Sequence, residues 1–164
     1  MLALAPQLLA ASALPSIAAA AHALAAIAWL GTVLVFAVHA GRVRATKTAD
    51  ESVALFQRLA IVNRAVALPG AVITALAGGY LIHAAGFTVT GHWWIGTGIA
   101  AWIVCFFGST MSRGSECVRI GAIAGEKGTD DEDAQWRMQR LVFLARGEAL
   151  LLVVALVVMV VQPT

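Results

Sequence analysis

The sequence predicts an all-α integral membrane protein, a four-helix bundle preceded by a short N-terminal interfacial helix. Of its 164 residues, 60% are hydrophobic and 12% are charged, and the mean hydropathy is +0.85. A soluble domain of this size could not cover so much apolar surface. The chain also holds four apolar runs of about 20 residues, the length that crosses a bilayer. As a third observation, all 11 Lys and Arg residues lie at one end of these runs.

The first span is predicted over residues 16–40. Apolar residues continue without a charge from Met1 to Gly41, which is too long for one crossing, and Pro15 interrupts them. Because proline disrupts a helix, we expect a short interfacial helix before Pro15 and the span after it. The alanine-rich start resembles a secretory signal, but it lacks the basic residues with which such a signal begins. We therefore expect it to remain uncleaved.

The second span is predicted over residues 61–85. Thr48, followed three residues later by Glu51, forms a capping box, so this helix should begin well before the membrane. Pro69 falls inside the span, where it removes one backbone hydrogen bond and should kink the helix. Gly78 and its neighbour Gly79 offer a small-residue surface on which another helix can approach closely.

The third and fourth spans are predicted over residues 92–112 and 141–161. The third helix should continue beyond the membrane, because a segment with charged residues follows its span. Thr129, followed by Glu132, forms a second capping box, which predicts that the last helix also begins outside the membrane. Since the four spans use almost the whole sequence, we expect a single transmembrane domain.

The basic residues lie in the loops after the first and third spans and on the adjoining helix ends. By the positive-inside rule these loops are cytoplasmic and both termini face outside. We expect a multi-pass protein of a bacterial cytoplasmic membrane, with lipid as its partner and a homo-oligomer or a larger membrane complex as its assembly. The sequence has no basic run interleaved with aromatic residues, no glycine-rich phosphate loop and no nucleophile, base and acid arrangement. This excludes nucleic-acid binding and does not support hydrolysis.

Three histidines share one depth near the predicted outer interface. They are His22, His83 and His92, each on a different span. Imidazole is the commonest metal ligand and a usual haem ligand, so this layer is a candidate site for copper, zinc or haem iron. Alternatively, the rings are interfacial, with their tips in the headgroups. His22 favours a site, because it lies on the same helix face as Trp29, seven residues later. A fourth histidine, His39, ends the same span on the predicted cytoplasmic side.

Glu148 is the intramembrane charge that most requires an explanation. It lies about 10 Å along the fourth span, where a carboxylate must be paired, protonated or hydrated. The predicted partner is Arg64 or Arg146, whereas Arg113 and Glu116 are expected at a solvated rim. Glu148 is then either a proton-relay group or half of a structural salt bridge. The alternative use of the arginines, Arg64 or Arg113, is to bind the propionates of a haem.

The first two spans carry a pattern of polar, aromatic and small residues. The pattern comprises His22, Trp29, Gly31, Phe56, Arg58, Leu59, Pro69, Gly70, Thr74, Gly78 and Gly79. It resembles the HemJ and CopD group of small bacterial membrane proteins and a related uncharacterised integral-membrane family. Resemblance to HemJ, a haem-b-associated protoporphyrinogen oxidase, implies that His22 is an iron ligand. Resemblance to CopD, which is linked to copper uptake, implies that His22 is a copper ligand.

One departure bears on this resemblance. HemJ has a lysine in its third helix, and the third span here has none, which favours the uncharacterised relative. The leading hypothesis is a bundle that binds haem b or another redox cofactor, a candidate membrane oxidoreductase, with His22 as one axial ligand and His83 as the second. One alternative is a copper site on the same histidines. Another is a non-catalytic membrane subunit or assembly partner.

Overall fold

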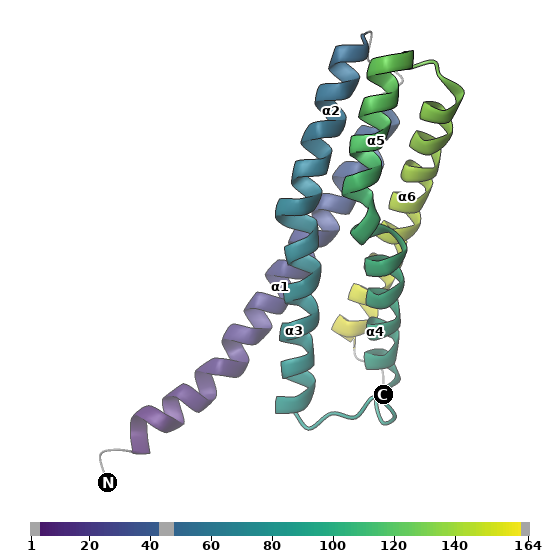
Figure 1. Cartoon of the computed structure of the whole chain (residues 1–164). Coiled ribbons are helices and arrows are strands. Elements are labelled where there is room, and N and C mark those ends of the chain that lie inside the picture. Colours follow the sequence, from purple (N-terminus) through teal and green to yellow (C-terminus); the bar gives the residue numbers. More distant parts are fainter. Residues whose placement is uncertain (1–3, 43–47, 162–164) are drawn as a thin grey trace.

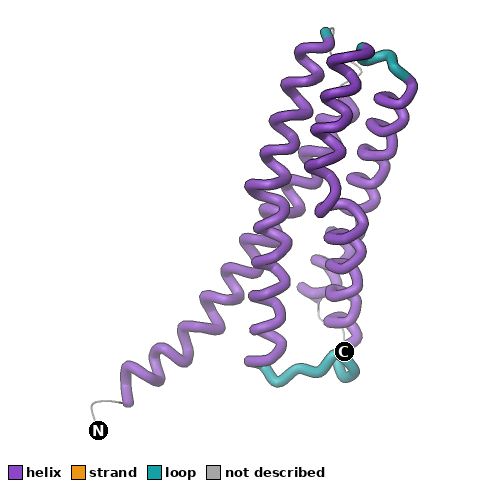
Figure 2. The backbone as a smooth tube through the Cα atoms, in the orientation of Figure 1, coloured by secondary structure: helices purple, strands orange, loops and turns teal. Residues whose placement is uncertain are grey.

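The computed structural model describes the backbone of residues 4–42 and 48–161, and the side chains of residues 13–38, 48 and 50–161. Within these ranges the chain is helical, with no strand (Figure 2). Two of the elements, η2 and η3, are π-helical turns. In chain order the elements are α1 (Leu4–Arg42), α2 (Ala49–Val62), η2 (Asn63–Ala67), α3 (Leu68–Ala84), α4 (Trp93–Cys105), η3 (Phe106–Thr110), α5 (Met111–Lys127) and α6 (Glu132–Val161).

Four of the helical rods among the described residues are long and apolar enough to cross a membrane, and they run alongside one another (Figure 1). The predicted all-α membrane bundle is therefore confirmed. α1 packs on α3 and α6, α2 packs on α5, and α4 packs on α6. The candidate spans are Ala13–Val38, Asp50–Ala84, Trp93–Lys127 and Glu132–Val161.

The two ends of this bundle differ in charge. At the end that we call the charged end, α2 begins and α5 turns back into α6, and the half of the bundle at this end carries the Lys and Arg residues of the described part of the chain. At the uncharged end, residues 85–92 connect α3 to α4 without a Lys, Arg, Asp or Glu. Figure 1 shows that the N-terminal part of α1 diverges from the other helices toward this uncharged end.

Pro15 was expected to interrupt a helix and Pro69 to kink one, and the structure accommodates the two prolines in different ways. Pro15 lies inside α1, which continues through it, so the separate interfacial helix expected before Pro15 is not present. Breaking the helix in an apolar medium would leave several backbone groups unpaired, whereas proline removes only one hydrogen bond. Pro69 follows the π-helical turn η2, in which the N–H of Leu68 donates to the carbonyl of Asn63. The side chain of His39 lies outside the described residues.

The helix starts at the charged end use side-chain caps. Thr48 accepts a hydrogen bond from the N–H of Glu51, which confirms the first predicted cap. The second prediction, a cap at Thr129, is wrong. Asp131 fills this role instead, because its Oδ1 accepts the N–H groups of Asp133 and Ala134 at 3.1 and 3.2 Å. α6 begins at Glu132, so the residue directly before it is the one that can reach the free N–H groups.

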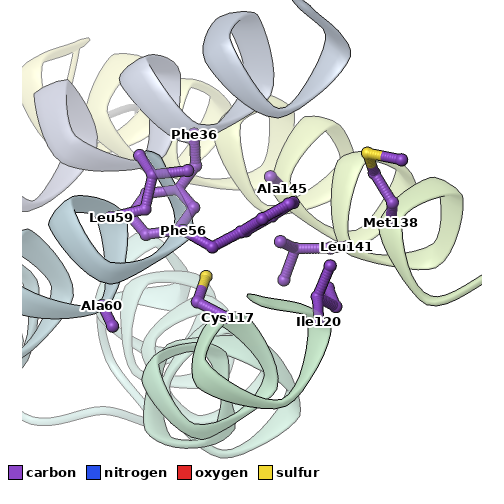
Figure 3. Packing of buried hydrophobic residues seen from close by; sticks show 9 residues of the cluster. All are labelled: Phe36, Phe56, Leu59, Ala60, Cys117, Ile120, Met138, Leu141 and Ala145. Atoms are coloured by element: carbon purple, nitrogen blue, oxygen red, sulfur yellow. The ribbon is translucent and has the colours of Figure 1, made fainter. Parts of the chain in front are cut away.

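The larger of the two clusters of buried apolar residues lies in the half of the bundle near the charged end. Figure 3 shows its side chains converging from α1, α2, α5 and α6, with Phe36 and Phe56 fully buried. A second cluster, with Trp29 and Val33, lies further toward the middle and draws on α1, α3, α4 and α6. Beyond it, toward the uncharged end, the helices leave a half-open cavity between them, and some of the side chains that line it, such as Ile27 and Val160, are exposed.

Candidate functional site

The cavity near the uncharged end has a volume of about 550 Å³ and is lined by α1, α3, α4 and α6. A volume of this size falls within the range of small-molecule and cofactor sites. Its wall is almost entirely aliphatic, glycine and alanine side chains. The exceptions that bring chemistry to the wall are His22, Trp29, Thr74, Trp102 and Met159.

His22 is held in the cavity wall by a contact with α3. Its Nδ1 lies 2.8 Å from the carbonyl oxygen of Thr74. A carbonyl only accepts, so Nδ1 carries a proton, and in the neutral ring Nε2 then has the lone pair that can bind a metal. Gly78 makes room for the ring, because a Cβ at that position would lie 2.9 Å from Cε1 of His22. The predicted close approach is thus confirmed at Gly78, where the group that approaches is an imidazole, but not at Gly79, where no atom lies within 4 Å of a Cβ position.

Two tryptophan side chains of the cavity wall are held in place by hydrogen bonds from their indole N–H groups. The indole N–H of Trp102 donates to the carbonyl of Ala71 at 2.8 Å, and its ring stacks on Phe106 with 4.8 Å between centroids. The indole N–H of Trp29 donates to Oγ1 of Thr110 at 3.0 Å. Trp29 is 2% exposed, so it closes the inner side of the cavity and reaches the polar groups behind it.

These polar groups surround Glu148. Its Oε1 accepts the hydroxyl of Thr110 at 2.6 Å, and its Oε2 accepts from both Ser109 and Arg113. The side chains of Arg113 and Glu148 are 1% and 2% exposed. We call these four residues, together with Trp29 and Asn63, the buried polar cluster.

The buried polar cluster overturns two expectations. Arg113 does not lie at a solvated rim but pairs with Glu148 inside the bundle. The expected partners of Glu148, Arg64 and Arg146, are exposed. The reason is that Arg113 follows Ser109 by one α-helical turn and lies on the same inward face, where it also packs on the ring of Phe36 at 4.9 Å.

The two π-helical turns flank the buried polar cluster. η2 begins with Asn63, whose side-chain amide donates to the carbonyl of Thr110 at 3.0 Å, and η3 ends with Ser109 and Thr110. A π turn holds one residue more than an α turn and so rotates the following helix by about 100°. This rotation changes which residues of α3 and α5 face inward. Counting depth along regular helices cannot detect it.

A second, smaller hollow of about 120 Å³ opens near the charged end. It reaches the buried polar cluster at Ser109 and Arg113, and its outer wall holds Glu116 and Arg137. Arg137 donates to Glu116 at 3.3 Å and to Asp133 at 2.9 Å. The buried polar cluster therefore lies between the two hollows. It contributes Ser109 and Arg113 to the wall of the smaller one and Trp29 to the wall of the larger cavity.

The three predicted histidines are not brought together. His83 is exposed in the last turn of α3 and does not line the cavity. His92 contacts the ring of Phe87, with 4.7 Å between centroids, at the start of α4. In the described part of the chain, no three His, Cys, Asp or Glu side chains gather as a metal site would require. Neither Arg64 nor Arg113 lines the cavity, whereas the predicted His22 and Trp29 do.

The sequence reasoning missed Ser109, Thr110 and Met159. For the first two a signal was available, because adjacent serine and threonine residues inside an apolar span, one helical turn before an arginine, predict a polar face. Met159 gave no such signal. Its role depends on the position of the cavity.

Comparison with known proteins places the chain in a family. Neither a curated protein nor a solved structure matches it. The family model described as "Predicted integral membrane protein (DUF2269)" matches residues 16–163, which include all four predicted spans and the residues of both hollows. The chain belongs to this family of integral membrane proteins.

Proposed function

We propose that the protein binds haem b, or a redox cofactor of similar shape, in the cavity near the uncharged end, with His22 as an axial ligand. The observation that carries this proposal is the hydrogen bond from Nδ1 of His22 to the carbonyl of Thr74. Metal-binding histidines commonly donate their second ring N–H to a carbonyl in this way, which fixes the tautomer and directs the free nitrogen to the metal.

The chemistry of the cavity wall also supports the proposal. A porphyrin requires a large apolar site, and the half-open cavity has an apolar wall and a volume of about 550 Å³. The thioether of Met159 lies in the same wall, and methionine with histidine is an established axial pair for haem. Met159, rather than the exposed His83, would therefore hold the group together with His22. A haem held by these two residues would supply one-electron transfer.

The arginines do not fit the propionate role considered from the sequence. Arg113 is engaged by Glu148, and Arg64 is exposed and outside the cavity wall. By the positive-inside rule we propose that the uncharged end faces outward from a bacterial cytoplasmic membrane, with the charged end in the cytoplasm. The likeness of the first two spans to HemJ and CopD is in keeping with a cofactor at this depth.

Absorption spectroscopy of the detergent-purified protein, expressed with sufficient haem, tests the proposal. We expect a Soret band that is lost in His22→Ala and retained in His83→Ala, the matched control at an exposed histidine. Met159→Leu should keep the band but change its position, because an axial ligand is replaced. Absence of a Soret band, or its retention in His22→Ala, would contradict haem binding at this site.

Copper is the second candidate, because imidazole and thioether together suit Cu(I). His22 and Met159 are such a pair in one wall. A colourless preparation that retains about one copper per chain, which is lost in His22→Ala, would favour a copper site over a haem site. If neither haem nor copper is bound and a larger membrane protein co-purifies, a non-catalytic subunit becomes the better interpretation.

A further inference from the structure

The buried polar cluster separates two hollows that lie in opposite halves of the bundle. Ser109 lines the hollow near the charged end and donates to Oε2 of Glu148. On the other side, Thr110 donates to Oε1 of Glu148 and accepts from Trp29, which lines the larger cavity. Glu148 thus has one hydroxyl contact directed to each hollow.

The two contacts differ in what they can transmit. A serine hydroxyl both donates and accepts, so Ser109 can take a proton from water and pass its own proton to Glu148. The indole of Trp29 only donates, and it has no lone pair to receive a proton. Protons can therefore reach Glu148 from the charged end but cannot continue through Trp29 to the larger cavity.

We propose that Glu148 is a proton-binding site loaded from the charged end through Ser109, and that it balances charge changes in the larger cavity. A hydronium ion in the smaller hollow gives its proton to Oγ of Ser109 and becomes water. The hydroxyl proton of Ser109 moves to Oε2 of Glu148, which becomes neutral. The charge balance depends on the proposed cofactor, whereas the proton-binding site at Glu148 does not.

Two unpartnered atoms provide an independent reason to expect water here. Nη1 of Arg113 and Oδ1 of Asn63 are buried and have no hydrogen-bond partner among the described groups. Buried polar groups are rarely left without a hydrogen-bond partner. Nη1 of Arg113 is a donor and Oδ1 of Asn63 is an acceptor, and a water molecule can bond to both kinds of group. We would not expect an ion pair that serves only stability to leave a buried donor and a buried acceptor without hydrogen-bond partners.

Protonation of Glu148 also requires that Arg113 can leave it. Arg113 lines the smaller hollow together with Glu116, so a second carboxylate is available on the side to which it can turn. Among the described side chains, the titratable groups that face Glu148 are Arg113 from α5 and Cys105 from α4, whose sulfur lies 4.0 Å from the Glu148 carbonyl. α1 contributes Trp29, and η2 contributes Asn63, neither of which titrates.

Infrared spectroscopy of the full chain in lipid nanodiscs tests the proton site without any cofactor. Lowering the pH should produce a protonated-carboxyl C=O band that is missing from Glu148→Gln. In a stopped-flow pH jump, Ser109→Ala should slow the appearance of this band by at least about tenfold. Ser112→Ala is the matched control, because it lines the same hollow without contacting Glu148, and its rate should equal that of the unaltered protein.

The site is overturned if no band disappears in Glu148→Gln, or if Ser109→Ala and Ser112→Ala respond at the same rate. Should Glu148→Gln fail to fold, the comparison of the two serine variants still decides, because both keep the Glu148 and Arg113 pair. When a cofactor is present, its midpoint potential should depend on pH, and Glu148→Gln should remove at least about half of that slope. Equal slopes overturn the charge balance alone, whereas a missing Soret band contradicts the proposed function and leaves the infrared result to decide the proton site.

Discussion

The two halves of the bundle differ in how their interiors are filled. Near the charged end, Phe36 and Phe56 pack against the neighbouring helices, and the pair formed by Arg113 and Glu148 is enclosed behind them. Near the uncharged end the same four rods leave a half-open cavity of about 550 Å³. Inside a membrane, helices associate through close packing and interhelical hydrogen bonds. We therefore expect substitutions in the packed half to lower stability most, whereas the cavity gives the other half room for a ligand.

Of the substitutions considered, Arg113→Ala should lower the stability of the protein most. It leaves the carboxylate of Glu148 buried without its counter-charge, which we expect to cost about 3–5 kcal/mol. Unfolding in mixtures of detergent and sodium dodecyl sulfate measures the change. Arg146→Ala, at an exposed arginine on α6, is the control and should change stability by less than about 0.5 kcal/mol. Equal losses in the two variants would show that the buried pair does not stabilise the packed half.

Thr110→Val tests the link between the two halves. The substitution keeps the shape of the side chain but leaves Oε1 of Glu148 and the indole N–H of Trp29 without their shared partner. We expect a cost of about 1–3 kcal/mol for each of these groups. Thr97→Val, which loses only a hydroxyl contact to its own helix, should be nearly neutral. A small effect of Thr110→Val in the same unfolding assay would mean that water replaces the hydroxyl.

Gly78→Ala addresses the hollow half. The added methyl group would lie 2.9 Å from Cε1 of His22, so α1 or the imidazole must shift, and we expect a loss of about 1–3 kcal/mol. The same variant should weaken the binding of any cofactor held by His22. Gly79→Ala is the adjacent control, because no atom lies within 4 Å of its Cβ position. If both variants keep stability and ligand content, the contact between His22 and α3 does not organise the cavity.

Asp131→Ala should have the smallest effect of the four. It removes the acceptor of two N–H groups at the start of α6, which typically costs about 1 kcal/mol. Thr129→Ala, at the neighbouring residue that lies outside the cap, should leave stability unchanged. The difference between the two, measured by unfolding, locates the helix start. A larger loss of stability in Thr129→Ala than in Asp131→Ala would instead support the capping box at Thr129 that was expected from the sequence.

Local signals predicted the caps and the glycines only in part. Thr48 caps α2 as expected, because a threonine directly before a helix leaves little choice of partner. Asp131 replaces Thr129, because the start of α6 lies two residues further on than the motif suggested. Gly78 was expected to allow a close approach, but its sequence neighbours do not reveal that the approaching group is His22.

The candidate site depended more heavily on contacts between distant residues. His22 and Trp29 were identified because a polar ring inside an apolar span is rare and lies on a definable face. Arg113 was assigned to the wrong environment, and Met159 was not considered. The π turn η3 changes the rotation of α5, and the place where the helices leave a cavity follows from the whole bundle.

By itself, the sequence determined that this chain is helical, that it lies in a membrane with four spans, and which end of those spans carries the charge. These properties depend on hydrophobicity and on basic residues summed over segments of about 20 residues, which neighbours in the chain decide. Only the tertiary structure decided that Glu148 meets Arg113 and that His22 meets Thr74. Such pairs depend on the rotation and spacing of helices, because a shift of one residue turns a side chain by about 100° and moves it to another neighbour.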